Sequence, residues 1–226
     1  MRKILIFASI LLLHFGFYAC GNVAQQEQNT QIDKQSKDKF TLIGEKSFLT
    51  GYEPVNTDGT INIVVEIPTG TTAKWEVTKP DGIMKWEFKN SKPRVVKYLG
   101  YPGNYGMIPK TLLPEELGGD GDPLDVILLG DALPRGSVAQ GRLVGVLKLL
   151  DSGEQDDKLI AISHDSPLAS ATSMEELQER YPSVLEIVEL WFSNYKGRGV
   201  MESKGFGDQA EAEDVLHSAI AAFKQH

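Results

Sequence analysis

The chain has 226 residues and a net charge of −8, with 41% hydrophobic and 24% charged residues. These values are typical of a soluble globular protein and exclude a fibrous or wholly disordered chain. The negative charge argues against nucleic acid as a partner, and an anionic ligand would need cations to mediate between it and an acidic protein.

The N-terminus has the layout of an export signal. Arg2 and Lys3 precede an apolar run over residues 4–19, which is short for a membrane span, and Cys20 follows. The sequence FYAC resembles a bacterial lipobox, in which Cys20 would be lipidated. Ordinary cleavage after Gly21 is the alternative, because small residues also stand at that position and two residues before it. We expect a signal peptide over 1–20 and a lipid-anchored protein of the bacterial cell envelope, with a soluble secreted or periplasmic protein as the alternative.

Residues 21–38 contain almost nothing to bury and are rich in Gln, Asn, Lys and Asp, which predicts a disordered tether. The remaining residues, 39–226, have the length of one domain. Cys20 is the single cysteine, so disulfides within the chain are excluded.

The domain begins with β-type alternation. Residues 61–67 place Ile or Val at every second position, and residues 73–77 repeat the pattern, so that Glu66, Lys74 and Glu76 can share one polar face. Further strands are predicted at 83–88, 126–129, 143–150 and 158–162.

Helices are predicted only near the C-terminus. Ser183 can cap one helix with an apolar stripe, and Asp208 with Glu211 resembles a capping box that opens another. Many short strands followed by helices predict an α+β domain. Its core would be a small closed or highly curved antiparallel β-barrel, OB-like, with the C-terminal helices packed outside.

The motif DGDPLD packs three carboxylates, Asp120, Asp122 and Asp125, into one turn before a buried strand. Such acids repel one another unless a cation lies among them, and oxygen ligands favour a hard cation such as Mg²⁺. A polar turn or a calcium loop is the alternative interpretation, although the EF-hand spacing fails because Leu124 occupies its fifth position.

A second acidic group lies in KLLDSGEQDDKLIAIS, which has the pattern of a hairpin and carries Asp151, Asp156 and Asp157. Asp and Gly are common turn formers, so this segment alone favours an ordinary turn. Beside DGDPLD it could complete a multi-metal site, with Lys158 directing a cation into the same pocket. None of the four histidines is suitably placed for this site, which disfavours zinc.

The loop GYPGNYGMIP brings together Tyr101 and Tyr105. Their hydroxyls could donate hydrogen bonds to phosphate oxygens, or both rings could simply pack in the core. Tyr195 has the same two possibilities, because it lies on the apolar stripe of its helix.

Five segments in order carry a resemblance to a known family: VVEIPTGTTAKWEV, YPGNYG, DGDPLDV, VGVLKLLDSGEQDDKL and the pair Tyr195-Lys196. Together they resemble the soluble family I inorganic pyrophosphatases, from about Asn62 to Lys196. The resemblance implies a metal site made by Asp120, Asp122, Asp125, Asp151, Asp156 and Glu66. It implies a pyrophosphate-binding set made by Lys74, Arg94, Tyr105, Lys158, Tyr195 and Lys196, with Glu76 and Tyr101 as further pocket positions. Arg94 departs from the pattern, because it lies one residue nearer to YPGNYG than in common bacterial relatives.

The resemblance implies hydrolysis of inorganic pyrophosphate to two phosphates at a site with several Mg²⁺ ions. A metal-activated water would attack, and Asp122 would act as general base. It also implies a homo-oligomer. The alternative is an exported lipoprotein that binds cations or phosphate on the same fold without turnover.

Overall fold

The structure is a computed structural model that describes residues 36–113 and 121–225. The chain divides into two compact units, Met1–Lys34 and Gln35–His226, and the described residues belong to the second. Within these ranges, no helix is both long enough and apolar enough to cross a membrane.

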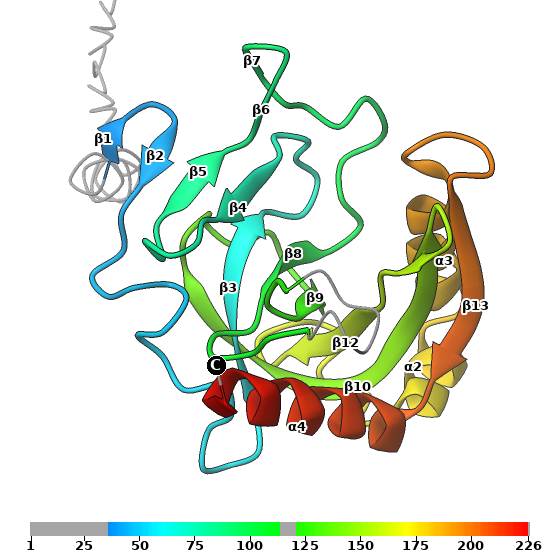
Figure 1. Cartoon of the computed structure of the whole chain (residues 1–226). Coiled ribbons are helices and arrows are strands. Elements are labelled where there is room, and N and C mark those ends of the chain that lie inside the picture. Colours follow the sequence, from blue (N-terminus) through cyan, green and yellow to red (C-terminus); the bar gives the residue numbers. More distant parts are fainter. Residues whose placement is uncertain (1–35, 114–120, 226) are drawn as a thin grey trace, which may run out of the picture. The chain divides into compact units, whose positions relative to one another are not determined.

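Five strands form a closed ring (Figure 1). They are β3 (Ile61–Ile67), β8 (Asn104–Met107), β9 (Asp125–Leu129), β12 (Lys158–Ser163) and β10 (Val138–Asp151). Each strand pairs with the next in this order, and β10 pairs with β3 to close the ring. The predicted small barrel is therefore confirmed. Its sheet is mixed, however, because β12 returns from β10 into the space beside β9 and runs parallel to it.

Strand β10 links the barrel to the rest of the sheet. One of its edges pairs with β3 over Val138–Gly141 and with β13 (Met201–Gly207) over Val146–Asp151. Its other edge pairs with β12 and with β11 (Glu154–Gln155). The strand is longer than the predicted 143–150 because its first residues, Val138–Gly141, pair with β3.

A second, small sheet lies against β3. Its order is β1 (Ser36–Asp38), β2 (Thr41–Leu42), β5 (Met84–Trp86) and β4 (Trp75–Val77). Strands β6 (Phe88–Lys89) and β7 (Lys92–Pro93) form a separate hairpin after it. Strand β1 lies inside the segment 21–38 predicted as a tether. The Asp38 carboxylate accepts hydrogen bonds from Phe40 and Thr41, which fixes the turn into β2.

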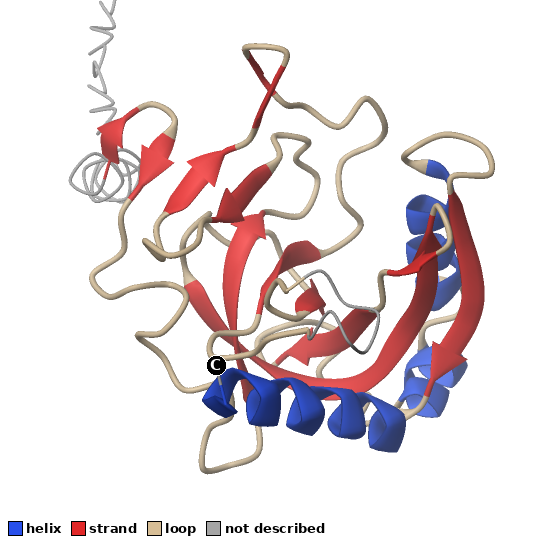
Figure 2. Cartoon of the chain, in the orientation of Figure 1, coloured by secondary structure: helices blue, strands red, loops and turns tan. Residues whose placement is uncertain are grey.

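Three helices cover the outside of the curled sheet (Figure 2). They are α2 (Met174–Arg180), α3 (Val184–Asn194) and α4 (Gln209–Gln225). The starts of α3 and α4 agree with the prediction, whereas α2 and strand β13 were not predicted.

The capping predictions were only partly right. Ser183 has a left-handed backbone with φ 67° and makes no side-chain cap, so its capping role is wrong. Asp208 does accept the Glu211 amide at 2.9 Å. The Glu211 carboxylate pairs with Lys148 instead of completing a capping box.

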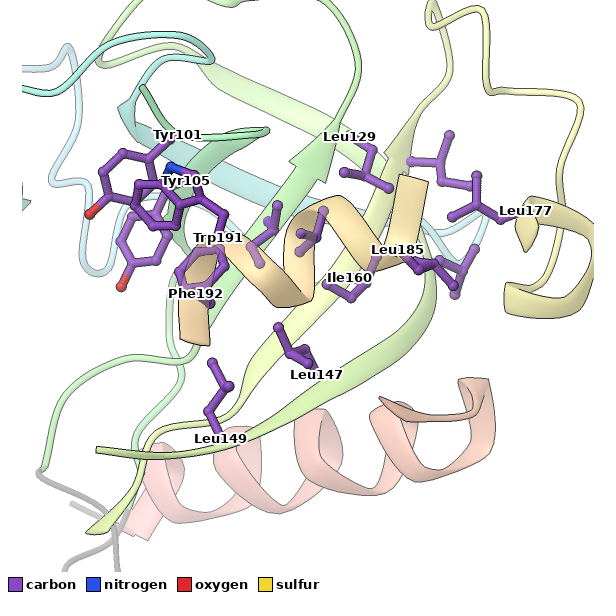
Figure 3. Packing of buried hydrophobic residues seen from close by; sticks show 14 of the residues in the cluster. Tyr101, Tyr105, Leu129, Leu147, Leu149, Ile160, Leu177, Leu185, Trp191 and Phe192 are labelled. Atoms are coloured by element: carbon purple, nitrogen blue, oxygen red, sulfur yellow. The ribbon is translucent and has the colours of Figure 1, made fainter. Parts of the chain in front are cut away.

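The core explains the departure of β3 from simple alternation. Ile61 and Ile63 enter one apolar cluster and Ile67 another, while Val64 packs with Phe48 in a third. Both faces of β3 are therefore buried, and the carboxylate of Glu66 is buried with them. Figure 3 shows the cluster between α3 and the barrel, where Tyr101, Tyr105 and Trp191 meet.

The segment predicted as a tyrosine loop contains the fully buried strand β8. Gly106 makes this possible, because a β-carbon at this position would lie 1.9 Å from the Val64 carbonyl oxygen. Only glycine allows β8 to approach β3 this closely.

Candidate active site

A cavity of about 490 Å³ opens at one end of the barrel, where several strands end. Seven acids line it: Glu66, Glu76, Asp122, Asp125, Asp151, Asp156 and Asp157. Five cations lie among them: Lys74, Lys79, Arg94, Lys158 and Lys196. Tyr105 and Tyr195 complete the polar lining. Such a lining suits a small, highly charged ligand and not an apolar one.

Strand ends place most of these groups. Asp125 begins β9, Asp151 ends β10 and Lys158 begins β12. The last two are brought together by the predicted hairpin, whose turn is Ser152-Gly153 with φ values of 54° and 97°. Two positive φ values define the tight turn that matches strand twist. The hairpin thus places Lys158 beside the pocket carboxylates of Asp125 and Asp156.

Lys158 is the most deeply buried charge of the pocket. Its side chain is 2% exposed, and Nζ donates to Asp125 at 2.5 Å and to Asp156 at 2.6 Å. Burial alone would lower the pKa of Lys158, but the two carboxylates outweigh it and raise the pKa above its ordinary value. Burial raises the pKa of Asp125, yet Lys158 and the Tyr105 hydroxyl pull it below its usual range. The pKa of Asp156 is raised, chiefly by burial.

Two further lysine pairs lie at the more open part of the pocket. Lys196 pairs with Asp151, and this hydrogen bond lowers the pKa of the Asp151 carboxyl. Lys79 pairs with Asp122 and also donates to the Gly121 carbonyl at 2.7 Å. Lys79 therefore holds the end of the acidic loop against β4.

Glu66 lies at the back of the pocket. Its carboxylate accepts the Val77 amide at 2.6 Å. Burial raises the pKa of Glu66 to about 8, against the opposing influence of Lys74. Lys74 lies 4.0 Å from Glu76, so the predicted shared polar face of these three residues is confirmed.

Arg94 enters the pocket from the residue after β7. Its Nη1 donates to both carboxylate oxygens of Glu87, at 2.9 and 2.6 Å. The main chain joins the same two residues, since the Arg94 amide donates to the Glu87 carbonyl at 2.7 Å. Glu87 therefore positions the guanidinium, and Arg94 lines the pocket although it lies one residue nearer to YPGNYG than the family pattern implies.

The tyrosines take different positions. Tyr105 and Tyr195 line the cavity, whereas Tyr101 does not. The Tyr101 ring packs 4.3 Å from Trp191 and 5.2 Å from Tyr105, measured between ring centres. Of the two possibilities left open for Tyr101, the structure supports packing.

The donor set fits a hard metal ion. All anionic groups of the lining are carboxylates, and they outnumber the cations. In residues 36–113 and 121–225, no three possible ligands already converge into a cage, and lysines pair with five of the seven acids. The residues that would hold a metal are Asp122, Asp125, Asp151, Asp156 and Glu66. Asp120 and Cys20 lie outside the described residues.

Sequence reasoning missed Lys79 and Glu87, and it placed Asp157 only within the second acidic group. Lys79 follows Lys74 by five residues at the end of β4, and its direction could not be read from an alternating pattern. Asp157 accepts the Leu149 amide at 2.9 Å, which makes it a support of the hairpin. Glu87 was hidden inside a predicted strand that in fact ends at Trp86.

A small barrel whose pocket joins carboxylates with lysines and an arginine fits the class of proteins that bind phosphate groups together with metal ions. The inorganic pyrophosphatase family model matches residues 63–224, and the chain belongs to this family. Its members depend on metal ions, generally Mg²⁺.

Similar proteins come from several kingdoms. The mitochondrial inorganic pyrophosphatase of Saccharomyces cerevisiae is 38% identical over 61% of this chain and 50% of its own length. The inorganic pyrophosphatase of Gluconobacter oxydans is 33% identical over 73% and 91%. A vacuolar soluble pyrophosphatase of Trypanosoma cruzi, truncated at its N-terminal domain and solved in complex with PPi, has a TM-score of 0.74 at 26% identity, covering 80% of this chain and 79% of its own. The chain spans half to two thirds of the first curated relatives it matches.

Proposed function

We propose that the chain hydrolyses inorganic pyrophosphate to two phosphates. The observation that carries this proposal is the convergence of seven carboxylates and five cations on one small cavity. The Trypanosoma cruzi relative was solved with PPi, which supports the same substrate here. Binding without turnover is the alternative, and none of the comparisons supports it.

Different lining residues would serve different steps of the hydrolysis. Asp122, which is about half exposed, would take a proton from the attacking water as that oxygen bonds to one phosphorus. The bridging P–O bond then breaks, and its electrons pass to the leaving phosphate. Lys74, Arg94 and Lys158 would neutralise the charge on that phosphate. Mg²⁺ held by the carboxylates would supply charge neutralisation and a more acidic water.

The test is phosphate release by the purified chain from pyrophosphate, with and without Mg²⁺. A nucleoside triphosphate and a phosphomonoester serve as control substrates, because the polar lining offers nothing to hold a base or a sugar. We expect rapid Mg²⁺-dependent release from pyrophosphate alone. A folded, Mg²⁺-binding chain that releases no phosphate would favour the alternative.

Glu87→Ala should weaken pyrophosphate binding more than turnover. Loss of the carboxylate frees the Arg94 guanidinium to rotate, and a hydrogen bond to a charged group contributes about 1.5–3 kcal/mol. We therefore expect KM to rise roughly tenfold or more, with a smaller change in kcat. The KM of Glu87→Gln should lie between those of Glu87→Ala and the parent. The matched control is Glu53→Ala, which removes a surface partner of Lys110. A fall in kcat with constant KM would contradict a positioning role.

We also propose that the chain is exported and lipidated at Cys20, and that it forms a homo-oligomer. The apolar run and the lipobox-like sequence support the anchor, and soluble secretion is the alternative. Light scattering on the purified chain would test the oligomer.

Cys20→Ser should move most of the protein from the membrane fraction to the soluble fraction, because it removes the acceptor of the lipid. Fractionation of expressing bacteria and incorporation of a labelled fatty acid would measure this change. A membrane fraction equal to that of the parent would refute lipidation as the anchor.

A further inference from the structure

Exposed apolar side chains gather in one short segment of the domain. Six large apolar side chains are exposed in the described part of the chain, and four of them lie within residues 88–99. They are Phe88, Val95, Tyr98 and Leu99, with exposed fractions of 48, 47, 42 and 72%. Single exposed apolar residues are ordinary, whereas four of the six here are concentrated in twelve consecutive residues.

The same segment is strongly basic in an acidic protein. Residues 85–99 contain four lysines and Arg94 against the single acid Glu87, while the whole chain carries −8. Lys89 and Lys92 are directly paired across the β6–β7 hairpin. Like charges in this position repel each other. Among the described residues, neither of these lysines nor Lys97 has an acidic partner within 4 Å.

The hairpin is short and projects from the domain (Figure 1). Its turn, Asn90-Ser91, has φ values of 54° and 60°, which is the tight two-residue form. The Phe88 ring packs edge-on against Phe40 at 5.0 Å. The turn and this ring contact place Phe88 on the surface beside the β1–β2 turn.

The hairpin also lies near the start of the described domain. Phe40, which contacts Phe88, is in the turn between β1 and β2, and β1 begins at Ser36. The preceding 35 residues contain the apolar run and Cys20. If the apolar run or a lipid on Cys20 is anchored in a membrane, that membrane is a surface that the hairpin can contact.

We propose that Phe88, Lys89, Lys92, Lys97, Tyr98 and Leu99 form a patch that docks the folded domain on an anionic lipid surface. Three exposed ammonium groups match anionic headgroups, and the tyrosine and phenylalanine rings suit the interface between headgroups and acyl chains. This contact goes beyond catalysis, and it is separate from any lipid on Cys20. It would relieve the repulsion between Lys89 and Lys92, which no acid of the described residues neutralises within 4 Å.

A local fluorescent probe tests the patch in the full chain. Cys20→Ser removes the only cysteine, and Ser91→Cys then places an environment-sensitive dye at the hairpin tip. Ser218→Cys on the exposed side of α4 is the matched control. Both labelled proteins are mixed with vesicles of phosphatidylcholine alone or with phosphatidylglycerol.

We expect a blue shift of the dye at residue 91 with anionic vesicles only, and no shift at residue 218. Replacing Lys89, Lys92 and Lys97 by Gln should raise the lipid concentration needed for half of this blue shift on the order of 100-fold. Added salt should raise that concentration as well. The proposal would be overturned if the emission of the dye at residue 91 did not change, or if it shifted equally with neutral vesicles. A response that needs only higher protein concentration would assign the patch to contact between two copies of the chain and also overturn it.

Discussion

Asp122→Asn should fold normally and lose pyrophosphate hydrolysis by roughly 100-fold or more. The amide keeps the size of the side chain but cannot accept the proton of the attacking water. Asp122 is about half exposed and pairs with Lys79 at the mouth of the pocket, so its replacement leaves no deeply buried charge. The measurement is kcat/KM for pyrophosphate at saturating Mg²⁺, together with the urea midpoint.

Asp81→Asn is the control for this experiment. Asp81 has a similar exposure, pairs with Lys85, and lies outside the pocket lining. The kcat/KM of the Asp81→Asn variant should stay within about twofold of the parent's, as for an ordinary surface substitution. If Asp122→Asn turned over at the parent's rate, Asp122 could not be the general base.

Lys158→Met should destabilise the fold by up to about 3–5 kcal/mol, because it leaves the partly buried carboxylates of Asp125 and Asp156 without their cation. Lys158 is only 2% exposed and bonds both acids. Its raised pKa contributes stability that is complete below the ordinary lysine value and is lost as pH rises through the folded value. Urea unfolding at neutral pH without added metal measures the loss.

Lys148→Met provides the matched comparison. Lys148 also lies on a barrel strand and pairs with Glu211, but both side chains are well exposed to solvent. Solvent screens a surface pair of this kind, so its loss should change stability far less than the loss of Lys158. Equal losses for the two variants would show that Lys158 is not the central charge of a buried network.

The barrel was predictable where a strand has one buried face or follows a clear turn. The hairpin after Asp151 was placed correctly, because Ser152-Gly153 separates two apolar runs. Strand β8 was missed because YPGNYG is rich in turn residues. There the glycine serves close packing against Val64 and not a turn.

The site was predictable as a set of acids and cations, because charged residues before or after apolar runs belong at strand ends. Its pairings were not. Whether Lys79 contacts Asp122, or Glu87 holds Arg94, depends on how segments far apart in the chain meet. Tyr101 shows the same limit, because a tyrosine near a pocket can belong wholly to the core.

The two-sided pairing of β10 also governs how the domain opens. Val138–Asp151 is hydrogen-bonded to β3 and β13 along one edge and to β12 and β11 along the other. The first part of the strand closes the ring through β3 and β12, and its end pairs with β13 and β11, so detaching any part of β10 breaks its pairing with another strand. Backbone amides of β10 should therefore exchange with deuterium only through global unfolding, while the β6–β7 hairpin exchanges early. Asp151 would then be held in the pocket by the most persistent strand of the domain.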